Sequence, residues 1–166
     1  MLRIIKQIEQ LDIRQLMAVY EETNRINGAK MYGKLSENLQ ILYAEQDFYA
    51  YLEMFFSTSD SIYAVWAHEG VYKAALRLEQ YCDGLIITGL ETALRDRRKG
   101  YATSLLQDVI YYVKENCPGK LYSHIEKANN ASLKLHQKVG FQKMLETATY
   151  IDGSFHNDAY TFCLEF

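Results

Sequence analysis

One apolar run near the middle of the chain restricts the fold more than any other feature. Residues Leu85 to Leu90 are almost continuously apolar, which is typical of a central strand buried on both faces of a sheet. Two earlier runs, Ser61 to Ala67 and Lys73 to Gln80, alternate with the period of two that a strand requires. Turn residues at Glu69-Gly70 and Asp83-Gly84 join the runs. The sequence therefore predicts three consecutive antiparallel strands.

The first sixty residues carry a helical spacing of apolar side chains. Asp12 can cap a first helix, because its carboxylate can accept a hydrogen bond from a free amide of the first turn. A second helix is expected from Ser36 to Phe56, with allowance for a break near Asp47. The segment Asn24 to Lys34 between them contains two glycines, and we expect it to be a loop.

The remainder of the chain returns to alternating helix and strand signals. From Tyr101 the apolar spacing is helical, and it ends before Cys117-Pro118-Gly119. The later expected elements are a strand from Lys120 to Glu126, a short helix capped by Asn129 or Asn130 and closed by Gly140, and a strand pair at Phe141 to Tyr150 and Ala159 to Glu165. This order predicts an α/β fold of the α+β type, with a mixed, largely antiparallel central sheet flanked by helices.

Composition narrows the class of protein. The 166 residues are 49% hydrophobic, which suits one domain spanning residues 1–166 with a sizeable core. A single proline, Pro118, and no Ser/Gly-rich stretch leave no linker signal. No apolar run reaches the roughly 20 residues of a membrane span, and the N-terminus lacks the apolar core of a signal peptide, so we expect a cytoplasmic protein with no membrane partner. The net charge of -3 argues against a nucleic-acid partner.

A basic segment follows the apolar strand and leads into the helix that starts at Tyr101. Free amides and the positive end of the helix dipole favour an anion there. Gly100 and Ala102 leave the main chain accessible, and three cations stand beside them. The alternative interpretation is a solvated loop in which the glycine serves a turn. The spacing fits neither a Walker-type loop nor the Rossmann fingerprint.

Two segments resemble the GNAT superfamily of N-acetyltransferases. That family carries the signature Gln/Arg-x-x-Gly-x-Gly/Ala between a strand and a helix, which is similar to Arg97-Arg98-Lys99-Gly100-Tyr101-Ala102. The second segment, Asn129 to Phe141, resembles the family's Asn-x-x-Ala/Ser-x-x-Leu-Tyr-x-Lys-x-Gly-Phe helix. The resemblance covers Ser61 to Phe166, whereas the first sixty residues match only in their pattern of helices.

The resemblance implies where the coenzyme binds. In this family two neighbouring parallel strands, here Leu85 to Thr92 and Lys120 to Glu126, splay apart and hold the acyl-pantetheine arm of acetyl-CoA between them. Main-chain groups of Leu90, Glu91 and Thr92 would pair with that arm and polarise the thioester carbonyl. Asn129 would hold it from the other wall. The expected coenzyme-binding residues at the helix start are Arg97, Arg98, Lys99, Gly100, Tyr101 and Ala102.

Candidates for proton transfer come from three positions. His136 stands where much of the family has a tyrosine that protonates the departing thiolate; it is a candidate acid, and the alternative is a ring that only fills the tyrosine's space. Glu91 is the leading candidate base, although it could instead pair with Arg77 or Arg95. His124 is a further candidate base, with a structural role as its alternative. No His, Cys or carboxylate spacing suits a metal, so none is expected.

Two departures from the family pattern also stand near the basic segment. Leu94 occupies a position where the family often has proline, and Asp96 adds a negative charge beside the expected phosphate site. We expect neighbouring cations to neutralise Asp96.

Together these features predict an N-acetyltransferase that transfers an acetyl group from acetyl-CoA to a primary amine by direct attack in a ternary complex. The acceptor would be a small-molecule or peptide amine. An alternative from another class is a catalytically degenerate module that binds acyl-CoA without turnover. It is suggested by His136, which stands in place of the family's tyrosine. Nucleic-acid binding through Arg95 to Lys99 is a third hypothesis, opposed by the acidic balance. A homodimer is compatible with the sequence, although no pattern specifies one.

Overall fold

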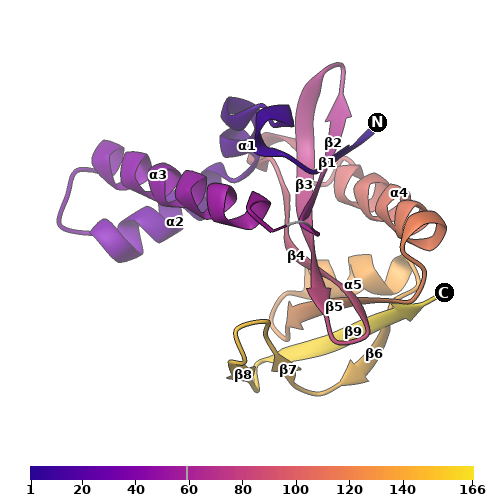
Figure 1. The fold of residues 1–166 in the computed structure, drawn as a ribbon. Helices are drawn as coiled ribbons and strands as arrows, with labels where there is room; N and C mark the ends of the chain where they lie inside the picture. The colour runs from indigo at the N-terminus through magenta and orange to yellow at the C-terminus, as the bar shows by residue number, and fades with distance from the viewer. Residues whose placement is uncertain (59) are drawn as a thin grey trace.

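The computed structural model describes residues 1–58 and 60–166. A central sheet has helices on both faces (Figure 1). Its strands, in the spatial order β1-β2-β3-β4-β5-β9-β6, are β1 (Leu2–Ile5), β2 (Ile62–His68), β3 (Val71–Tyr81), β4 (Gly84–Thr92), β5 (Lys120–Glu126), β9 (Ala159–Glu165) and β6 (Gln142–Leu145). All neighbouring pairs are antiparallel except β4 and β5. The predicted mixed, largely antiparallel α/β fold is confirmed.

The helices lie in two groups, one for each face of the sheet. They are α1 (Ile13–Val19), α2 (Glu21–Tyr32), α3 (Glu37–Phe56), α4 (Tyr101–Asn116) and α5 (Asn130–Lys138), with short 3-10 helices η1 (Ile8–Gln10) and η2 (Leu94–Asp96). Strand β2 shows how the sheet divides two cores. Its Ile62 and Ala64 pack in the core that includes α4, while Tyr63 and Val65 pack in the core that includes α1 and α3. Alternation along one strand thus fills both faces.

The predicted hairpins are present with one shift of a turn. Glu69 and Gly70 both have positive φ angles between β2 and β3, as a tight hairpin turn requires. The next turn is at Cys82 and Asp83 rather than at Asp83-Gly84, because Gly84 already belongs to β4. Gly84 lies against β5, where a Cβ atom would approach the Lys120 carbonyl oxygen to 2.1 Å. This glycine therefore permits close strand approach.

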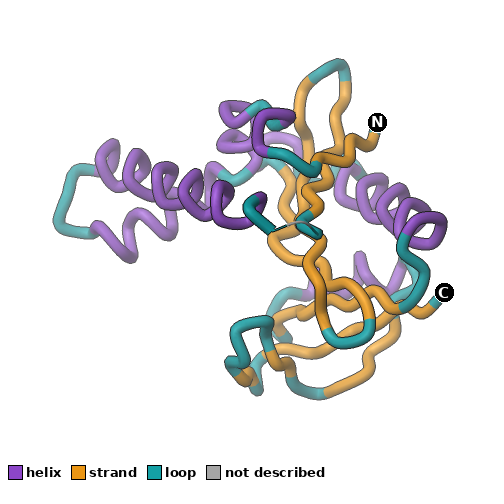
Figure 2. The backbone as a smooth tube through the Cα atoms, in the orientation of Figure 1, coloured by secondary structure: helices purple, strands orange, loops and turns teal. Residues whose placement is uncertain are grey.

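The loop expected from Asn24 to Lys34 is wrong, because this segment forms most of helix α2. Figure 2 shows it as a helix antiparallel to α3, and the pair extends away from the sheet. Gly28 was part of the loop signal, but it marks the place where α2 and α3 touch: a Cβ atom there would lie 2.4 Å from the Gln40 carbonyl oxygen. Helix α3 runs unbroken through Asp47, which accepts a hydrogen bond of 2.6 Å from the Tyr32 hydroxyl.

The expected strand from Phe141 to Tyr150 is interrupted, so that prediction needs correction. Its first part, β6, pairs with β9 in the main sheet. Its second part, β7 (Ala148–Thr149), pairs instead with β8 (Phe155–His156) in a separate two-stranded sheet. The β6–β9 register already shifts between Lys143 and Leu145. The chain thus leaves the main sheet before the Asp152-Gly153 turn.

The central opening in the sheet arises where β4 and β5 separate. Their parallel pairing covers Gly84 to Ile87 against Lys120 to Ser123 and then stops. Beyond Ile87, β4 continues along β3 while β5 continues along β9. The predicted splayed pair is therefore present, and the last residues of β4 have no strand partner on the β5 side. Among the residues that the structure describes, no helix is long and apolar enough to cross a membrane.

Gly28→Ala tests the tight contact between α2 and α3. The added methyl group would collide with the backbone at Gln40, so we expect a loss of about 1–3 kcal/mol in the free energy of unfolding. Denaturant titration measures this change. Lys30→Ala is the control, because Lys30 is exposed on the same helix. Equal stability of Gly28→Ala and the unaltered protein would show that the contact is not tight.

Candidate active site

The gap between the splayed strands opens as a cleft of about 520 Å³. It brings together segments that are far apart in the sequence: the start of α2, the end of β4, the basic loop and the start of α5. Its lining residues are Glu22, Thr23, Leu90, Glu91, Thr92, Arg97, Arg98, Ala102, Asn129, Ala131, Ser132 and Leu135. Seven of the predicted coenzyme-binding residues thus lie around one cavity, whereas Lys99, Gly100 and Tyr101 do not line it.

The backbone of the basic loop leaves a row of amides open at the start of α4. Arg98 and Gly100 have positive φ angles of 64° and 88°, and Gly100 occupies the N-cap position without a side-chain cap. Within the described chain, no protein group accepts a hydrogen bond from the amides of residues 98–103. A Cβ atom at Gly100 would meet nothing within 4 Å. The loop therefore presents unpaired donors and open space, which suits a phosphate group.

Asp96 stabilises this loop rather than opposing an anion. Its buried carboxylate pairs with Lys99 at 2.9 Å and with Lys73 at 3.1 Å. The hydrogen bond from Lys99 holds the pKa of Asp96 below its ordinary value. The expected neutralisation by neighbouring cations is confirmed. Because of this ion pair, the Lys99 ammonium is directed at Asp96.

The other side chains of the loop divide between the cleft and the core. Arg97 donates a hydrogen bond to the Glu22 carboxylate of α2, and Arg98 lines the cleft beside it. Tyr101 instead packs its ring on Trp66, with ring centroids 5.3 Å apart. Across the cleft, the Asn129 side-chain oxygen accepts a hydrogen bond of 3.1 Å from the Ser132 amide and so caps α5. Its amide nitrogen has no acceptor in the described chain.

The end of β4 is held in an irregular shape. Gly89 has a φ of 57°, and the register between β3 and β4 shifts opposite it, between Ala75 and Arg77. The Tyr20 hydroxyl donates a hydrogen bond of 2.5 Å to the Gly89 carbonyl and accepts one of 2.9 Å from Tyr63. Burial raises the pKa of Tyr20 to about 12, so the phenol stays protonated and remains a donor.

Glu91 stands between the cleft and a second cavity. It lines the cleft and also a cavity of about 320 Å³ between α2, α3 and the sheet. Thr23 of α2 donates a hydrogen bond to its carboxylate. Burial raises the pKa of Glu91 above its ordinary value, an effect that the Thr23 hydrogen bond partly offsets. A carboxylate with a raised pKa at the junction of two cavities is well placed to take up a proton.

The second cavity combines aromatic walls with a few charges. Its lining residues are Tyr20, Thr23, Asn24, Asn27, Met31, Ala44, Asp47, Phe48, Tyr51, Arg77, Gly89 and Glu91. Only Glu91 and Thr23 are shared with the cleft. A molecule in this cavity would therefore reach the cleft at Glu91.

His136 lies away from both cavities. Its side chain is 1% exposed and packs against Phe141. Since a carbonyl can only accept, Nδ1 carries the proton and donates to the Ser132 carbonyl at 2.9 Å. Nε2 then accepts from the Ser123 hydroxyl at 3.0 Å. Burial lowers the pKa of His136, so the ring is neutral and both nitrogens are occupied, an arrangement that favours a structural role.

His124 lies on the opposite face of β5 from Ser123. Its ring packs among Tyr81, Tyr150 and their neighbours, with centroid distances of 5.2 Å and 4.9 Å. Neither ring nitrogen has a hydrogen-bond partner among the described residues, and burial lowers the pKa of the ring. His124 lines neither of the two cavities that meet at Glu91.

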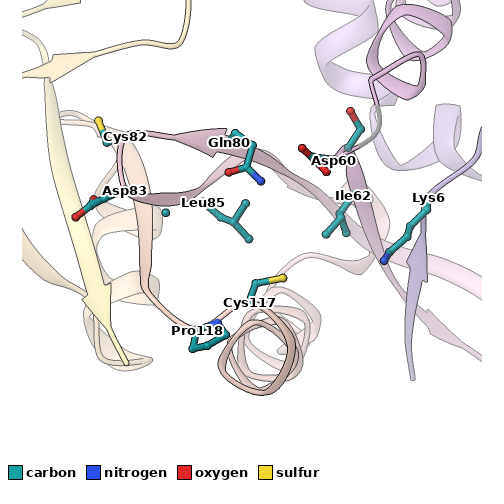
Figure 3. Close-up of a pocket in the computed structure, with 11 residues that line it drawn as sticks. Lys6, Asp60, Ile62, Gln80, Cys82, Asp83, Leu85, Cys117 and Pro118 are labelled. Atoms are coloured by element: carbon teal, nitrogen blue, oxygen red, sulfur yellow. The ribbon is translucent and has the colours of Figure 1, made fainter.

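A further pocket lies at the other end of β4 and is shown in Figure 3. Leu85, Ile62 and Cys117 line it together with charged residues such as Asp83. Leu85 stands six positions before Glu91 in the chain, which corresponds to roughly 20 Å along a strand. It is therefore remote from the splay point. Among the described residues no three His, Cys, Asp or Glu side chains are grouped to hold a metal ion.

Comparison with known families identifies this arrangement. Residues 17–141 match the model of the acetyltransferase (GNAT) family. The chain belongs to the GNAT family. Members of this family are acyl-CoA-dependent acetyltransferases. The match begins well before Ser61, so it includes the α2–α3 pair that the sequence motifs did not reach.

Solved structures show the same GNAT fold at low sequence identity. The PaiA N-acetyltransferase from Thermoplasma acidophilum in complex with coenzyme A has a TM-score of 0.66 and 14% identity, covering 100% of this chain and 99% of that one. The ribosomal-protein-alanine N-acetyltransferase from Brucella melitensis has a TM-score of 0.69 and 19% identity, with coverages of 100% and 99%. A GNAT family acetyltransferase from Elizabethkingia anophelis with acetyl-CoA bound gives 0.57 and 17%, with coverages of 70% and 82%. No curated protein matches the chain.

Several residues of the site were not singled out from the sequence. Glu22 and Thr23 precede the expected loop from Asn24 to Lys34, and only the recognition of α2 as a helix places them in its first turn. The helical spacing after Asp12 indicates no more for Tyr20 than a position on a helix face. The sequence suggests Arg77 only as a possible partner for Glu91. Alternation along β3 places Arg77 on the same face as Ala75, and Ala75 is the residue that pairs with Glu91 in register.

Gly100→Glu tests whether the open amides hold the coenzyme. The new side chain would fill the space before residues 98–103 and add a negative charge there, so we expect coenzyme A affinity to fall roughly hundredfold or more. Isothermal titration calorimetry measures it. Gly153→Glu is the matched control, because Gly153 also has a positive φ and open surroundings but lies in the β7–β8 turn. Undiminished affinity in Gly100→Glu would contradict the site.

His136→Phe tests the structural role of the buried ring. The change leaves the Ser123 hydroxyl and the Ser132 carbonyl without their partner, so we expect a loss of about 1–3 kcal/mol in the free energy of unfolding. The turnover number of the folded fraction should remain near that of the unaltered enzyme. A large fall in turnover with unchanged stability would instead assign His136 to proton transfer.

Proposed function

We propose that this GNAT protein transfers an acetyl group from acetyl-CoA to a primary amine by direct attack in a ternary complex. The observation that carries the proposal is the position of Glu91, whose carboxylate borders both the cleft and the helix-lined cavity. Two substrates bound in these cavities would meet beside one proton acceptor. The proposal treats residues 1–166 as one catalytic domain.

Unpaired and charged groups around the cleft support coenzyme binding in this proposal. The amides of residues 98–103 and the side chains of Arg97 and Arg98 would hold the pyrophosphate, with Ala102 leaving room at the helix start. The unpaired edge of β4 from Leu90 to Thr92 would pair with the pantetheine arm. Asn129 would donate its free amide hydrogens from the opposite wall. Acetyl-CoA supplies an activated acyl thioester at the splay point.

Glu91 acts as the base in this proposal. The amine loses a proton to the carboxylate, its nitrogen bonds to the acyl carbon, and the carbon–sulfur bond breaks. Thr23 fixes the carboxylate by its hydrogen bond, and partial burial keeps the pKa of Glu91 closer to that of the amine than an exposed glutamate would be.

The departing sulfur takes its proton from water in this proposal. His136 has both nitrogens occupied, and His124 lines neither the cleft nor the helix-lined cavity, so neither ring is placed to donate. The alternative is a module that binds acyl-CoA without turnover. The same absence of a proton donor for the sulfur suggests it. Thiol release that depends on an added amine separates the two, because the module would bind coenzyme A yet release no thiol.

The acceptor is an amine of a small molecule or a peptide. One structural neighbour, a ribosomal-protein-alanine N-acetyltransferase, carries a name that indicates a protein amine as its acceptor. The helix-lined cavity of about 320 Å³ favours an acceptor group of limited size. The homodimer, the absence of a nucleic-acid partner and the cytoplasmic location stay predictions.

Glu91→Gln tests the base. The amide is similar in shape but cannot take up a proton, so we expect kcat to fall by roughly 10²- to 10⁴-fold. Because the base must be ionised, kcat/KM of the unaltered enzyme should decline as the pH falls through a Glu91 pKa that lies above the ordinary glutamate value. Initial rates of thiol release across pH measure both.

The variant should lose this acidic limb while keeping its affinity for coenzyme A. Glu37→Gln is the matched control, since Glu37 is exposed at the start of α3. An unaltered rate in Glu91→Gln would remove Glu91 from the mechanism and leave the proton to a water chain.

A further inference from the structure

Arg77 is a partly buried cation on the wall of the helix-lined cavity. It projects from β3 on the same sheet face as Glu91, with Arg77 opposite Thr88 and Ala75 opposite Glu91. Its side chain is 16% exposed, and the guanidinium carbon lies 4.8 Å from the centroid of the Tyr51 ring. The same residue lines the cavity. A positive charge thus stands beside the place where the acceptor amine must bind.

The protein leaves most of the hydrogen-bonding capacity of this guanidinium unused. Nε donates to the Thr88 hydroxyl at 3.2 Å, and the carboxylate that forms its ion pair, on Glu79, lies 3.9 Å away. Glu79 is itself engaged as the acceptor for Thr88. Within the described chain the two terminal nitrogens have no hydrogen-bond acceptor. A guanidinium carries five donors in a fork that matches a carboxylate, so the terminal nitrogens of this partly buried arginine are available to a ligand in the cavity that Arg77 lines.

Gly89 opens the space that the guanidinium occupies next to β4. A Cβ atom at Gly89 would lie 2.8 Å from a terminal nitrogen of Arg77, and the positive φ of 57° also suits glycine. Gly89 stands two residues before Glu91, at the edge where the strands separate. A ligand group that pairs with Arg77 would therefore lie close to the carboxylate of Glu91, the proposed base.

We propose that the acceptor is an amine that also carries a carboxylate, namely an α-amino acid with an apolar or aromatic side chain. This inference rests on the proposed function. The amine faces Glu91, the carboxylate forms a paired contact with the terminal nitrogens of Arg77, and the side chain lies along Phe48 and Met31 of the cavity wall. An α-amino acid carries its amine and its carboxylate on one carbon. Glu91 and Arg77 supply the matching anion and cation on one face of the sheet.

A polyamine is the competing acceptor, because Glu91 and Asp47 place two carboxylates on the same cavity. Asp47 is at the exposed rim and already accepts a hydrogen bond from Tyr32. A second ammonium group would also have to lie near the partly buried positive charge of Arg77. The charges nearest the splay point therefore favour a zwitterion over a polycation.

Matched acceptor pairs test the proposal on the intact enzyme. Leucine is compared with 3-methylbutylamine and phenylalanine with phenethylamine, and spermidine is added as the polycation, with thiol release measured at saturating acetyl-CoA. We expect kcat/KM to be roughly tenfold to hundredfold higher for each amino acid than for its decarboxylated partner. Equal or better use of the decarboxylated amines, or of spermidine, would overturn the inference while leaving the acetyltransferase proposal standing.

Arg77 variants separate recognition from a general structural effect. Arg77→Gln should raise KM for the amino acids and abolish their advantage, with little change for the decarboxylated amines. An equal loss for both members of a pair would contradict a carboxylate contact. Arg77→Lys keeps the positive charge and is the test variant if Arg77→Gln does not fold. It should lose part of the preference for the amino acids over their decarboxylated partners. Unchanged affinity for coenzyme A confirms that the cleft is intact.

A binding measurement distinguishes failure of this inference from failure of the proposed function. Calorimetric titration of leucine into the enzyme loaded with coenzyme A should show binding that Arg77→Gln weakens roughly tenfold or more. If no amine is acetylated, the proposed function fails, and the titration still decides the amino-acid site. Absence of leucine and phenylalanine binding at millimolar concentration would overturn the inference.

Discussion

Main-chain pairing between β4 and β5 ends at Ile87 and Ser123, and the geometry of the site depends on that separation. A continued ladder would satisfy the backbone of β4 and close the sheet. Instead, Gly89 turns β4 aside, and Tyr20 fixes its carbonyl with a buried phenol that remains protonated. The unpaired edge that results faces a cleft, and one face of the same strand carries Glu91 to the adjoining cavity.

Helix α2 connects the basic loop to Glu91, the proposed base. Its consecutive residues Glu22 and Thr23 contact Arg97 of the basic loop and the carboxylate of Glu91. The Asp96 carboxylate of the loop forms ion pairs with Lys73 and Lys99. These ion pairs hold the loop backbone in place, while the amides of residues 98–103 remain open. Polar and charged groups thus follow one another along the site: open amides and arginines at the proposed phosphate position, the partly buried carboxylate of Glu91, and the partly buried guanidinium of Arg77 beyond it.

The sequence predicted the elements whose signals are local. The apolar run of β4, the alternation of β2 and the caps Asp12 and Asn129 depend on neighbouring residues, and each is present. Helix α2 was missed because Gly28 signals a break locally, whereas its role is a contact with Gln40 of another helix. Likewise, the burial of His136 depends on Ser123 of β5, and no spacing along the chain reveals such a contact. Seven of the coenzyme-binding residues predicted from the resemblance line one cleft, but the resemblance did not predict the cavity on the other side of Glu91.

A crystal structure of the protein with coenzyme A tests the central claim most directly. The account predicts that the pyrophosphate accepts hydrogen bonds from amides within residues 98–103 and that the pantetheine lies between the separated ends of β4 and β5, with its sulfur on the Glu91 side. Coenzyme bound elsewhere, or those amides turned away from it while the strands close, would contradict the account.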